Sequence, residues 1–318
     1  MDSLTVIIPT FNRSAVLKIA LDAYCAQSAP NAIHELIVVD DGSTDDTEAT
    51  VTAVSRVSPF PIRYLRQTNR GPAAARNLGI TETRTDLILF TDSDINPDRS
   101  LVAQHLEWHN RYPQANVAVL GYVTWRPQPA PTPFMEWYGE NQLFAYREIR
   151  HKQYLDYSAF YSCNLSLKAN FLRAHGQFDE GFKTAAYEDI ELGYRLDNAG
   201  LRLRYNPQAV AYHNQYVLFG DACRRVRENS TAMRMFFQKE AGQHLLAQQR
   251  QKHFRVSRRI ARWVAKAIAT ILEPSKPLLD SNIHFPSYFY RLLFWHYATS
   301  RLDLDDPSFV RDVTSASG

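Results

Sequence analysis

The stretch Leu87-Ile88-Leu89-Phe90-Thr91-Asp92-Ser93-Asp94 places four apolar residues just before two carboxylates that lie two positions apart. A short, continuous apolar run of this kind indicates a strand that is buried on both faces of a sheet. Carboxylates at the end of such a strand can hold a hard cation such as Mg²⁺ or Mn²⁺, which often keeps substrate phosphates among its ligands. The alternative is a solvated turn before a helix capped by Asn96. Because a buried strand leads directly into the two carboxylates, the binding-site interpretation is favoured over the solvated turn.

Outward from this stretch, apolar runs alternate with helical patterns through roughly the first 120 residues. Strand, helix and strand in this order indicate right-handed βαβ units. We therefore expect an α/β fold with an open, mostly parallel sheet flanked by helices. The predicted strands are Leu4–Pro9, Leu36–Val39, Ile62–Leu65, Leu87–Phe90, Val117–Val123, Leu201–Tyr205 and Ala209–His213. The predicted helices are Ser14–Gln27, one that Gly71-Pro72 opens, and one that starts at Asn96-Pro97-Asp98.

Three polar clusters follow predicted strands directly: Pro9-Thr10-Phe11-Asn12, Asp40-Asp41-Gly42-Ser43 and Asp92-Ser93-Asp94. In open α/β sheets, ligands bind beyond the carboxyl ends of the strands. We therefore expect the three clusters to meet at one edge. The second cluster does not fit a twelve-residue calcium loop, because Gly42 and the missing glutamate break that pattern. Two interpretations of this cluster remain: a turn that caps the next helix, or a contact with a nucleobase.

Composition sets the broad class of the protein. The 318 residues are 45% hydrophobic and 22% charged, which is a globular balance. The net charge of +3 gives no reason to expect a nucleic-acid partner. The three cysteines, Cys25, Cys163 and Cys223, have neither metal-binding nor disulfide spacing, which fits a reducing compartment. We see no signal peptide and no apolar run long enough to span a membrane, so a cytoplasmic location is expected.

Five motifs in a fixed order carry a resemblance to a known family. They are Val6–Arg13, Ile37–Asp45, Gly71–Ile80, Phe90–Asp94 and Tyr187–Leu196. Together they resemble the family-2 glycosyltransferases of GT-A fold, over roughly residues 3 to 215. The resemblance implies an inverting, metal-dependent enzyme. Such an enzyme would move one sugar from a nucleoside-diphosphate sugar, with UDP as the expected nucleotide, to a hydroxyl group of a saccharide or lipid-linked acceptor.

The resemblance also implies roles for individual residues. The nucleotide pocket would be formed by Pro9, Thr10, Phe11, Asn12, Asp40, Asp41, Gly71, Arg76, Asp92 and Ser93. Within this set, Asp41 would face the base, Arg76 would lie near the nucleotide and Asp92 would touch the ribose. Asp94 would bind Mn²⁺ or Mg²⁺, with His213 as a second ligand. Without the resemblance, His213 is a lone histidine near a strand end, for which a structural role is the better interpretation.

The pair Glu188-Asp189 opens a predicted helix, where acids are also favoured by the helix dipole alone. By the resemblance, Asp189 is the base that removes the acceptor proton, and Glu188 holds the acceptor or orients the base. Tyr187 would shape this pocket or only pack. Asn164 would contact the donor or acceptor, with a buried turn as the alternative.

The chain is expected to divide into a catalytic domain, residues 1–217, and a helical C-terminal extension, residues 218–318. The catalytic domain would comprise a nucleotide-binding half, residues 1–115, and an acceptor half, residues 116–217. Residues 251–272 carry six Lys or Arg and no Asp or Glu, with apolar residues on one helical face. Such a helix either lies on an anionic membrane or packs on protein. The aromatic stretch 285–295 could dock the tail, form a homo-oligomer or touch lipid.

Two other functions remain as alternatives. A sugar-phosphate nucleotidyltransferase also combines an α/β nucleotide fold with metal, but the first strand-to-helix turn, Pro9–Asn12, has no Gly-rich, basic signature. A non-catalytic, membrane-associated protein that keeps the fold is the other alternative, and Asp94, Asp189 and His213 argue against it. The sequence does not identify the sugar or the acceptor. Assembly of a cell-surface polysaccharide or glycolipid is the expected setting.

Overall fold

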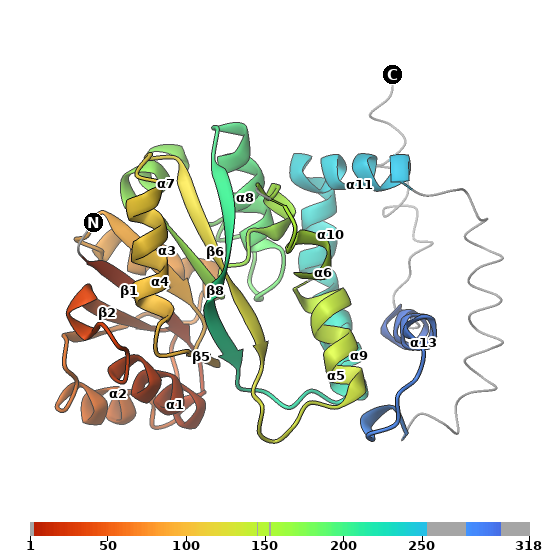
Figure 1. The fold of residues 1–318 in the computed structure, drawn as a ribbon, viewed down its shortest axis with the longest axis horizontal. Helices are drawn as coiled ribbons and strands as arrows, with labels where there is room; N and C mark the ends of the chain where they lie inside the picture. The colour runs from red at the N-terminus through yellow and green to blue at the C-terminus, as the bar shows by residue number, and fades with distance from the viewer. Residues whose placement is uncertain (1–2, 145, 153, 253–277, 300–318) are drawn as a thin grey trace. The chain divides into compact units, whose positions relative to one another are not determined.

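The computed structural model describes residues 3–144, 146–152, 154–252 and 278–299 (Figure 1). The chain forms two compact units. The first unit contains Met1–Arg126 and Phe144–Gln215, and the second contains Pro127–Leu143 and Tyr216–Gly318. The proline-rich segment after Arg126 therefore belongs to the same unit as the C-terminal residues. The predicted division of the sequence assigns this segment to the catalytic domain, residues 1–217.

The first unit is built on an eight-stranded sheet with strand order β3-β2-β1-β4-β7-β6-β8-β5. Strands β1 to β4 pair in parallel, as predicted. Strand β7 runs antiparallel to both of its neighbours, and β5 runs antiparallel to β8. The strands are β1 Leu4–Thr10, β2 Ile33–Asp40, β3 Ile62–Arg66, β4 Leu87–Thr91, β5 Ile95–Pro97, β6 Val117–Trp125, β7 Asn164–Lys168 and β8 Arg202–His213. Helices flank this mixed sheet, which confirms the predicted α/β architecture.

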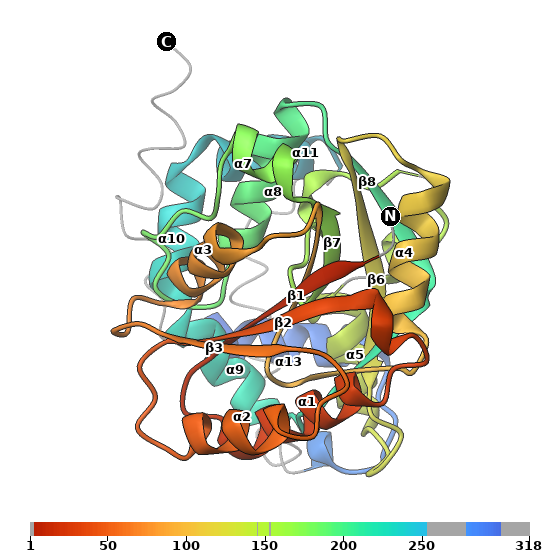
Figure 2. The ribbon, with the colours of Figure 1, turned by 90° about the vertical axis from the view of Figure 1, so that its left-hand side faces the viewer.

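The helices of the first unit follow the predicted βαβ order. They are α1 Ser14–Cys25, α2 Thr47–Ser55, α3 Pro72–Glu82, α4 Leu101–Arg111, α6 Tyr146–Ile149, α7 Ala169–His175 and α8 Glu188–Asn198. Figure 2 shows α1 and α2 on one side of β1–β3 and α3 on the other. This split follows from right-handed crossovers, because the chain moves outward from β1 to β3 and then returns to β4.

The expected helix start at Asn96 is wrong. Residues Ile95–Pro97 form β5, and Ile95 is the partner of His213 in β8. The backbone stays extended because the amide of Asp98 still donates to the carbonyl oxygen of Val210, at 2.9 Å. The helix α4 begins only at Leu101, after Asp98 has accepted hydrogen bonds from the amide and hydroxyl of Ser100.

Strand β8 joins two segments that the sequence predicts as separate strands. Gly121 of β6 pairs with Asn206, but the next residue, Tyr122, pairs with Val210. Residues 207–209 therefore form a bulge, which lets β8 continue to His213. The bulge explains why the apolar pattern is interrupted at this point of the sequence.

The second unit contains α5 Pro133–Tyr138, α9 Phe219–Glu228, α10 Ser230–Gln238, α11 Glu240–Lys252 and α13 Ser287–Thr299. Aromatic rings join α5, α9 and α13: Phe134 lies 5.3 Å from Phe219 and 5.9 Å from Tyr290 between ring centroids. The indole of Trp137 donates to the hydroxyl of Ser287, at 3.0 Å. Among the residues that the structure describes, no helix is both long and apolar enough to cross a membrane. The predicted basic helix 251–272 lies outside the described residues, apart from the end of α11.

Close packing between α3 and β1 gives a stability prediction. A Cβ atom on Gly79 would lie 2.6 Å from Cγ2 of Ile7, which is inside the core. We expect Gly79→Ala to lower the free energy of unfolding by about 1–3 kcal/mol. A Cβ atom on Gly220 in α9 would meet no other atom within 4 Å, so the matched control Gly220→Ala should raise stability by about 0.5–1 kcal/mol. Urea unfolding checks both; equal effects in the two variants would contradict the packing.

Candidate active site

Two turns at the carboxyl ends of β1 and β2 are tied together by Asn12. Its backbone amide donates to the Ser43 hydroxyl at 2.8 Å, and its side-chain oxygen accepts from the backbone amide of Thr44 at 2.7 Å. Asn12 adopts a φ of 52°, in the left-handed region that Asn tolerates better than most residues. The expected convergence of the first two polar clusters is therefore present. Around them, Pro9 and Thr10 are buried at the end of β1, whereas Phe11 is 44% exposed.

The carboxylate of Asp40 is used by the fold itself. It is buried, and its oxygens accept from the Ser43 amide at 2.9 Å and from the Tyr64 hydroxyl at 2.5 Å. Burial and the neighbouring Asp40 charge raise the pKa of the Tyr64 hydroxyl, so this donor keeps its proton. Asp40 therefore supports the turn that carries Asp41.

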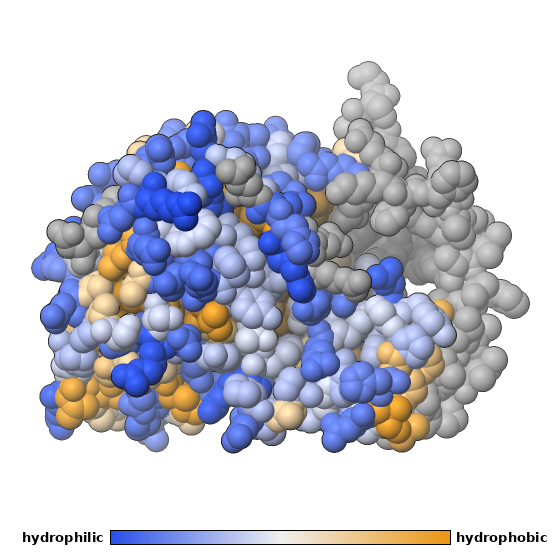
Figure 3. Space-filling model, in the orientation of Figure 1, coloured by the Kyte–Doolittle hydropathy of each residue, from blue (hydrophilic) through white to orange (hydrophobic). Residues whose placement is uncertain are grey.

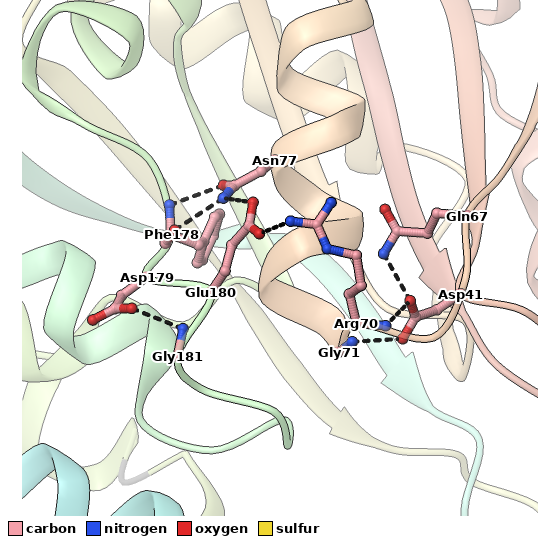
Figure 4. Close-up of polar contacts among 9 residues, drawn as sticks. All are labelled: Asp41, Gln67, Arg70, Gly71, Asn77, Phe178, Asp179, Glu180 and Gly181. Atoms are coloured by element: carbon pink, nitrogen blue, oxygen red, sulfur yellow. Dashed lines mark hydrogen bonds and ion pairs between the residues drawn. The ribbon is translucent and has the colours of Figure 1, made fainter.

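The carboxylate of Asp41 holds the loop that leads into α3 (Figure 4). It accepts from the Gln67 side chain at 2.7 Å and from the backbone amides of Arg70 and Gly71, each at 2.8 Å. Gly71 has a φ of 95°, and a Cβ atom there would lie 3.0 Å from the carbonyl oxygen of Lys183. Only glycine combines this backbone with this close approach. Asp41 thus sets the position of the loop expected to cover the nucleotide.

The same loop is joined to the segment before α8. Arg70 forms an ion pair with Glu180. Asn77 of α3 donates to the Phe178 carbonyl at 2.9 Å and accepts from the Phe178 amide at 3.0 Å, as Figure 4 shows. These contacts bring α3 and the approach to α8 together, although about 100 residues separate them in the sequence.

A buried guanidinium connects two of the predicted motifs. Arg76 is 2% exposed and donates to Oδ1 of Asp92 at 2.7 Å and to Oε1 of Glu188 at 2.8 Å. Its Cζ atom lies 5.4 Å from the centre of the Phe178 ring. A buried cation needs opposite charges and hydrogen-bond acceptors, and the two carboxylates supply both. The predicted nucleotide motif and the predicted base motif therefore meet at one side chain.

The pair Glu188-Asp189 begins α8 in an unusual way. Tyr187, the residue before the helix, has a φ of 69°, which is rare for an aromatic residue and turns the chain sharply into α8. Asp189 accepts from the Ser162 amide at 3.3 Å and from the Ile190 amide at 2.8 Å. Burial raises the pKa of Asp189, and burial together with the Asp189 charge raises the pKa of Glu188 to about 7. Glu188 can therefore exchange a proton near neutral pH.

The end of β8 lies beside the backbone of Asp94 through the pairing of β5 with β8. The Asn214 amide donates to the Asp94 carbonyl oxygen at 2.7 Å, directly beyond the pairing of Ile95 with His213. The Asp94 carboxylate accepts from the Gln215 side chain at 2.6 Å and forms an ion pair with Arg13. Between Asp92 and Asp94, Ser93 is buried.

Among the residues that the structure describes, no three or more His, Cys, Asp or Glu side chains come together in a group that could hold a metal ion. The two predicted metal ligands therefore do not complete a site by themselves. The ring centroid of His213 lies 5.4 Å from that of Trp125 and 6.2 Å from that of Phe144, so aromatic rings surround the imidazole.

The expected contact of Asn164 with a sugar does not fit the structure. Its side chain is 1% exposed, and Nδ2 donates to the carbonyl oxygens of Ala209 at 2.8 Å and Tyr122 at 3.3 Å. Its Oδ1 faces His105 at 2.9 Å. Both amide hydrogens are used within the sheet, so Asn164 belongs to the support of the site.

Sequence reasoning missed Arg13 and Gln215, which both contact the Asp94 carboxylate. Arg13 is the last residue of the motif Val6–Arg13, and its place in that motif is the signal that could have identified it. Gln215 follows His213 by two residues, and no local pattern distinguishes it from other surface amides.

The sequence model of the family described as Glycosyl transferase family 2 matches residues 5–176. A validoxylamine A glucosyltransferase of Streptomyces hygroscopicus subsp. jinggangensis is 29% identical over 221 residues, 62% of this chain and 52% of that protein. A chondroitin synthase of Escherichia coli is 29% identical over 245 residues, 68% of this chain and 35% of that protein. The chain thus spans about half, or less, of the length of these curated relatives.

Solved structures share the fold. A mannosyltransferase from Pyrobaculum calidifontis, in complex with GDP-Man and Mn²⁺, aligns with a TM-score of 0.56 at 19% identity, covering 98% of this chain and 79% of that one. S. aureus TarS in complex with UDP aligns with a TM-score of 0.55 at 16% identity, covering 93% of this chain and 89% of that one. These likenesses confirm the GT-A fold predicted from the sequence.

The raised pKa of Glu188 predicts a pH dependence of stability. Its value of about 7 lies above the ordinary 4.5, so the folded state binds more protons than the unfolded state between these pH values. Stability from this group is therefore lost as pH rises from about 4.5 to about 7. In Glu188→Gln this loss disappears, because the amide does not titrate. The free energy of unfolding of the variant, relative to that of the native protein, should therefore rise by on the order of 1–3 kcal/mol between about pH 4.5 and about pH 7.

Urea unfolding of both proteins at about pH 5 and about pH 7.5 measures this change. A stability difference that stays constant between the two pH values would contradict the environment described for Glu188.

Proposed function

The chain belongs to glycosyltransferase family 2, and from this we propose that it moves a single sugar, with inversion, from a nucleoside-diphosphate sugar to a hydroxyl group. One observation carries the proposal: Arg76 joins Asp92, expected at the nucleotide, to Glu188, which precedes the expected base. A transferase must hold its donor beside a base that faces the acceptor. The buried Arg76 ion pairs bring the two expected functions into one site.

In this proposal Asp189 removes the proton of the acceptor hydroxyl. The backbone amides of Ser162 and Ile190 each donate to one carboxylate oxygen of Asp189, which holds the group in place. Burial raises the Asp189 pKa, which strengthens its carboxylate as a base. Glu188, held by Arg76, orients the start of α8. Tyr187 closes the turn before this pair, and its strained backbone supports a role in shaping the acceptor pocket.

We further propose that a divalent cation, Mn²⁺ or Mg²⁺, binds at Asp94. The residue types fit, because carboxylate oxygen and imidazole nitrogen are ligands that Mn²⁺ accepts. The pairing of β5 with β8 also brings the backbone of Asp94 to Asn214, the residue after His213. The Asp94 carboxylate already faces a positive group, Arg13. The described side chains do not supply a full set of metal ligands. Diphosphate oxygens of the donor would provide the remaining ones. When bound, the ion would neutralise charge on the departing diphosphate.

The donor and acceptor follow from chemistry and relatives together. We propose UDP as the nucleotide. The TarS structure contains UDP, whereas the mannosyltransferase structure contains GDP-Man, so the choice of base needs a direct screen. We propose a saccharide or lipid-linked acceptor, because chondroitin synthases are among the relatives. A nucleotidyltransferase remains the less favoured alternative, since Pro9–Asn12 leads into α1 without a glycine-rich, basic turn.

Two substitutions separate donor binding from chemistry. Asp94→Ala should weaken metal-dependent binding of a nucleoside diphosphate by at least about tenfold, because the direct ligand is lost. Asp189→Asn should bind the nucleotide normally but lose at least about a hundredfold in transfer, because the amide cannot accept the proton. Calorimetric nucleotide titration with Mn²⁺ and initial rates over a panel of nucleotide sugars measure both. Normal transfer by Asp189→Asn would refute the base, and no turnover of any donor by the native protein would refute the enzyme.

We also propose that the second unit touches an anionic membrane surface, which would make the protein a peripheral one at the cytoplasmic face. The exposed stripe of α13 supports this: Tyr288 is 73% and Trp295 54% exposed, with the exposed Arg291 between them. Figure 3 shows the described surface coloured by hydropathy, with an apolar area at its lower right. Tyr, Trp and Arg suit the boundary between lipid head groups and acyl chains. The opposite face of α13, with Leu293 and Phe294, is buried. The basic stretch 251–272 adds positive charge next to α13 in the sequence.

Flotation with vesicles containing anionic lipid tests the membrane contact. The double variant Tyr288→Ser, Trp295→Ser should lower the bound fraction by about tenfold, because it removes two large apolar side chains. Val57→Ser, at a residue of the first unit that is 81% exposed, is the matched control and should float like the native protein. A native protein that stays with the soluble fraction would refute the contact, and self-association lost in the double variant would indicate a homo-oligomer interface instead.

A further inference from the structure

Helix α4 and strand β7 face each other through a row of buried polar side chains. His105 and His109 are one helical turn apart on α4, and Asn164, Ser166 and Lys168 alternate along one face of β7. All five are at most 4% exposed. Burying so many polar groups is costly unless each is paired. We call this set the α4–β7 polar row.

The row is a continuous chain of hydrogen bonds. Lys168 Nζ lies 2.6 Å from Nδ1 of His109, and Nε2 of His109 lies 2.8 Å from the Ser166 hydroxyl. The Ser166 hydroxyl lies 2.7 Å from Nδ1 of His105, and Nε2 of His105 lies 2.9 Å from Oδ1 of Asn164. The Lys168 ammonium also donates to the Tyr112 carbonyl, at 3.2 Å.

The chemistry of the two ends fixes the direction of donation. An ammonium group has only donors, so His109 must accept at Nδ1 and donate from Nε2. Asn164 donates through Nδ2 to the carbonyls of Ala209 and Tyr122, so its Oδ1 must accept from Nε2 of His105. His109 is then neutral. Burial lowers its pKa well below the usual value and lowers the pKa of His105 to about 4, so His105 is neutral as well.

The row ends at the point where three strands of the candidate site meet. The backbone of Asn164 pairs with Thr91, the residue before Asp92. Its side chain holds Tyr122 of β6 and Ala209 in the β8 bulge, four residues before His213. One amide thus links the strand that leads to Asp92 and Asp94 with the strand that leads to His213.

Gly121 makes room for the Asn164 amide. A Cβ atom on Gly121 would lie 2.2 Å from Nδ2 of Asn164 and 2.5 Å from the carbonyl oxygen of Ala209. Only a glycine at position 121 leaves room for the amide to lie across β6. The side chain is therefore confined by packing on one face and by His105 at its oxygen.

We propose that the α4–β7 polar row is a positioning device for the metal-binding edge of the site: by fixing the Asn164 amide, it sets the distance between the end of β4 and the end of β8. His105, His109, Ser166, Asn164 and Lys168 are then positioning residues that touch neither donor nor acceptor. Outer-shell partners that hydrogen-bond a metal ligand directly typically change metal affinity about 10- to 100-fold when they are removed. The row acts through Asn164 and Ala209, four residues before His213, so its effect should be smaller. The inference rests on the proposed metal role of Asp94 and His213.

Two substitutions at His105 separate positioning from packing. The glutamine amide nitrogen can take the place of Nε2, so His105→Gln keeps a donor to Asn164 and gives up the bond with Ser166. The asparagine side chain reaches only the place of Nδ1, so His105→Asn keeps the bond with Ser166 and gives up the donor to Asn164. Each variant loses one hydrogen bond and some volume, and a purely structural role predicts the same result for both.

The experiment measures Mn²⁺ binding to the full chain by the electron paramagnetic resonance signal of free Mn²⁺, with a nucleoside diphosphate present. We expect His105→Asn to weaken Mn²⁺ binding by about three- to tenfold and His105→Gln to change it by less than about twofold, because the row acts at one remove from the ligands. If the native protein binds Mn²⁺, equal affinities in the two variants would overturn the proposal.

A second readout does not depend on the metal. Amide hydrogen exchange at residues 209–214 should be faster in His105→Asn than in His105→Gln, because the bulge loses its fixed amide. If the native protein binds no Mn²⁺ but the exchange difference is present, the metal assignment fails and the positioning role stands. If the exchange rates are equal, the positioning role fails. Should His105→Asn not fold, Ser166→Ala, which breaks the row in its middle, is expected to shift both readouts in the same direction by a smaller factor.

Discussion

The arrangement of the site depends on the buried guanidinium of Arg76. It lies between Asp92, at the end of β4, and Glu188, at the start of α8, and almost no water reaches it. Removing one partner of such a group would leave an uncompensated charge in the interior, which costs far more than an exposed ion pair contributes. Helix α3, strand β4 and helix α8 are therefore constrained relative to one another at a single point, and Asp189 takes its position from that constraint.

The other acidic residues at this edge divide into two groups. Asp40 and Asp41 direct their carboxylates to backbone amides and neighbouring side chains, and so they shape the turns and the loop before α3. Asp94 instead contacts two side chains, that of Arg13, which is 45% exposed, and that of Gln215. A base contact by Asp41 would have to share its carboxylate with three existing donors. The edge thus combines carboxylates held by backbone amides with one, Asp94, that meets the side chains of Arg13 and Gln215.

The sequence predicts the part of the fold in which local pattern and burial agree. Strands β1, β2 and β4 are continuous apolar runs, and Gly71-Pro72 opens α3 as expected. Strand β7 escapes prediction because Ser166 and Lys168 point toward the histidines of α4, so that its buried face is polar. Strand β5 escapes because Asn96-Pro97-Asp98 has the residues of a helix start, and only the pairing with β8 keeps it extended.

The same reasoning applies to the site. The carboxyl ends of β1, β2 and β4 meet as parallel strands require, so the clusters of Asn12, Asp41 and Asp92 could be brought together from sequence alone. The ion pairs of Arg76 could not, because Glu188 lies 112 residues further along the chain. Contacts over such separations depend on how α3 and α8 pack, and no local pattern records this packing.

A crystal structure with Mn²⁺ and a nucleoside diphosphate would test the central claim most directly. We expect the ion to be bound directly by the Asp94 carboxylate with His213 beside it. Arg13 should have left Asp94, and Arg76 should still lie between Asp92 and Glu188. An ion bound elsewhere, or a nucleotide that leaves Asp92 and Asp94 untouched, would contradict it.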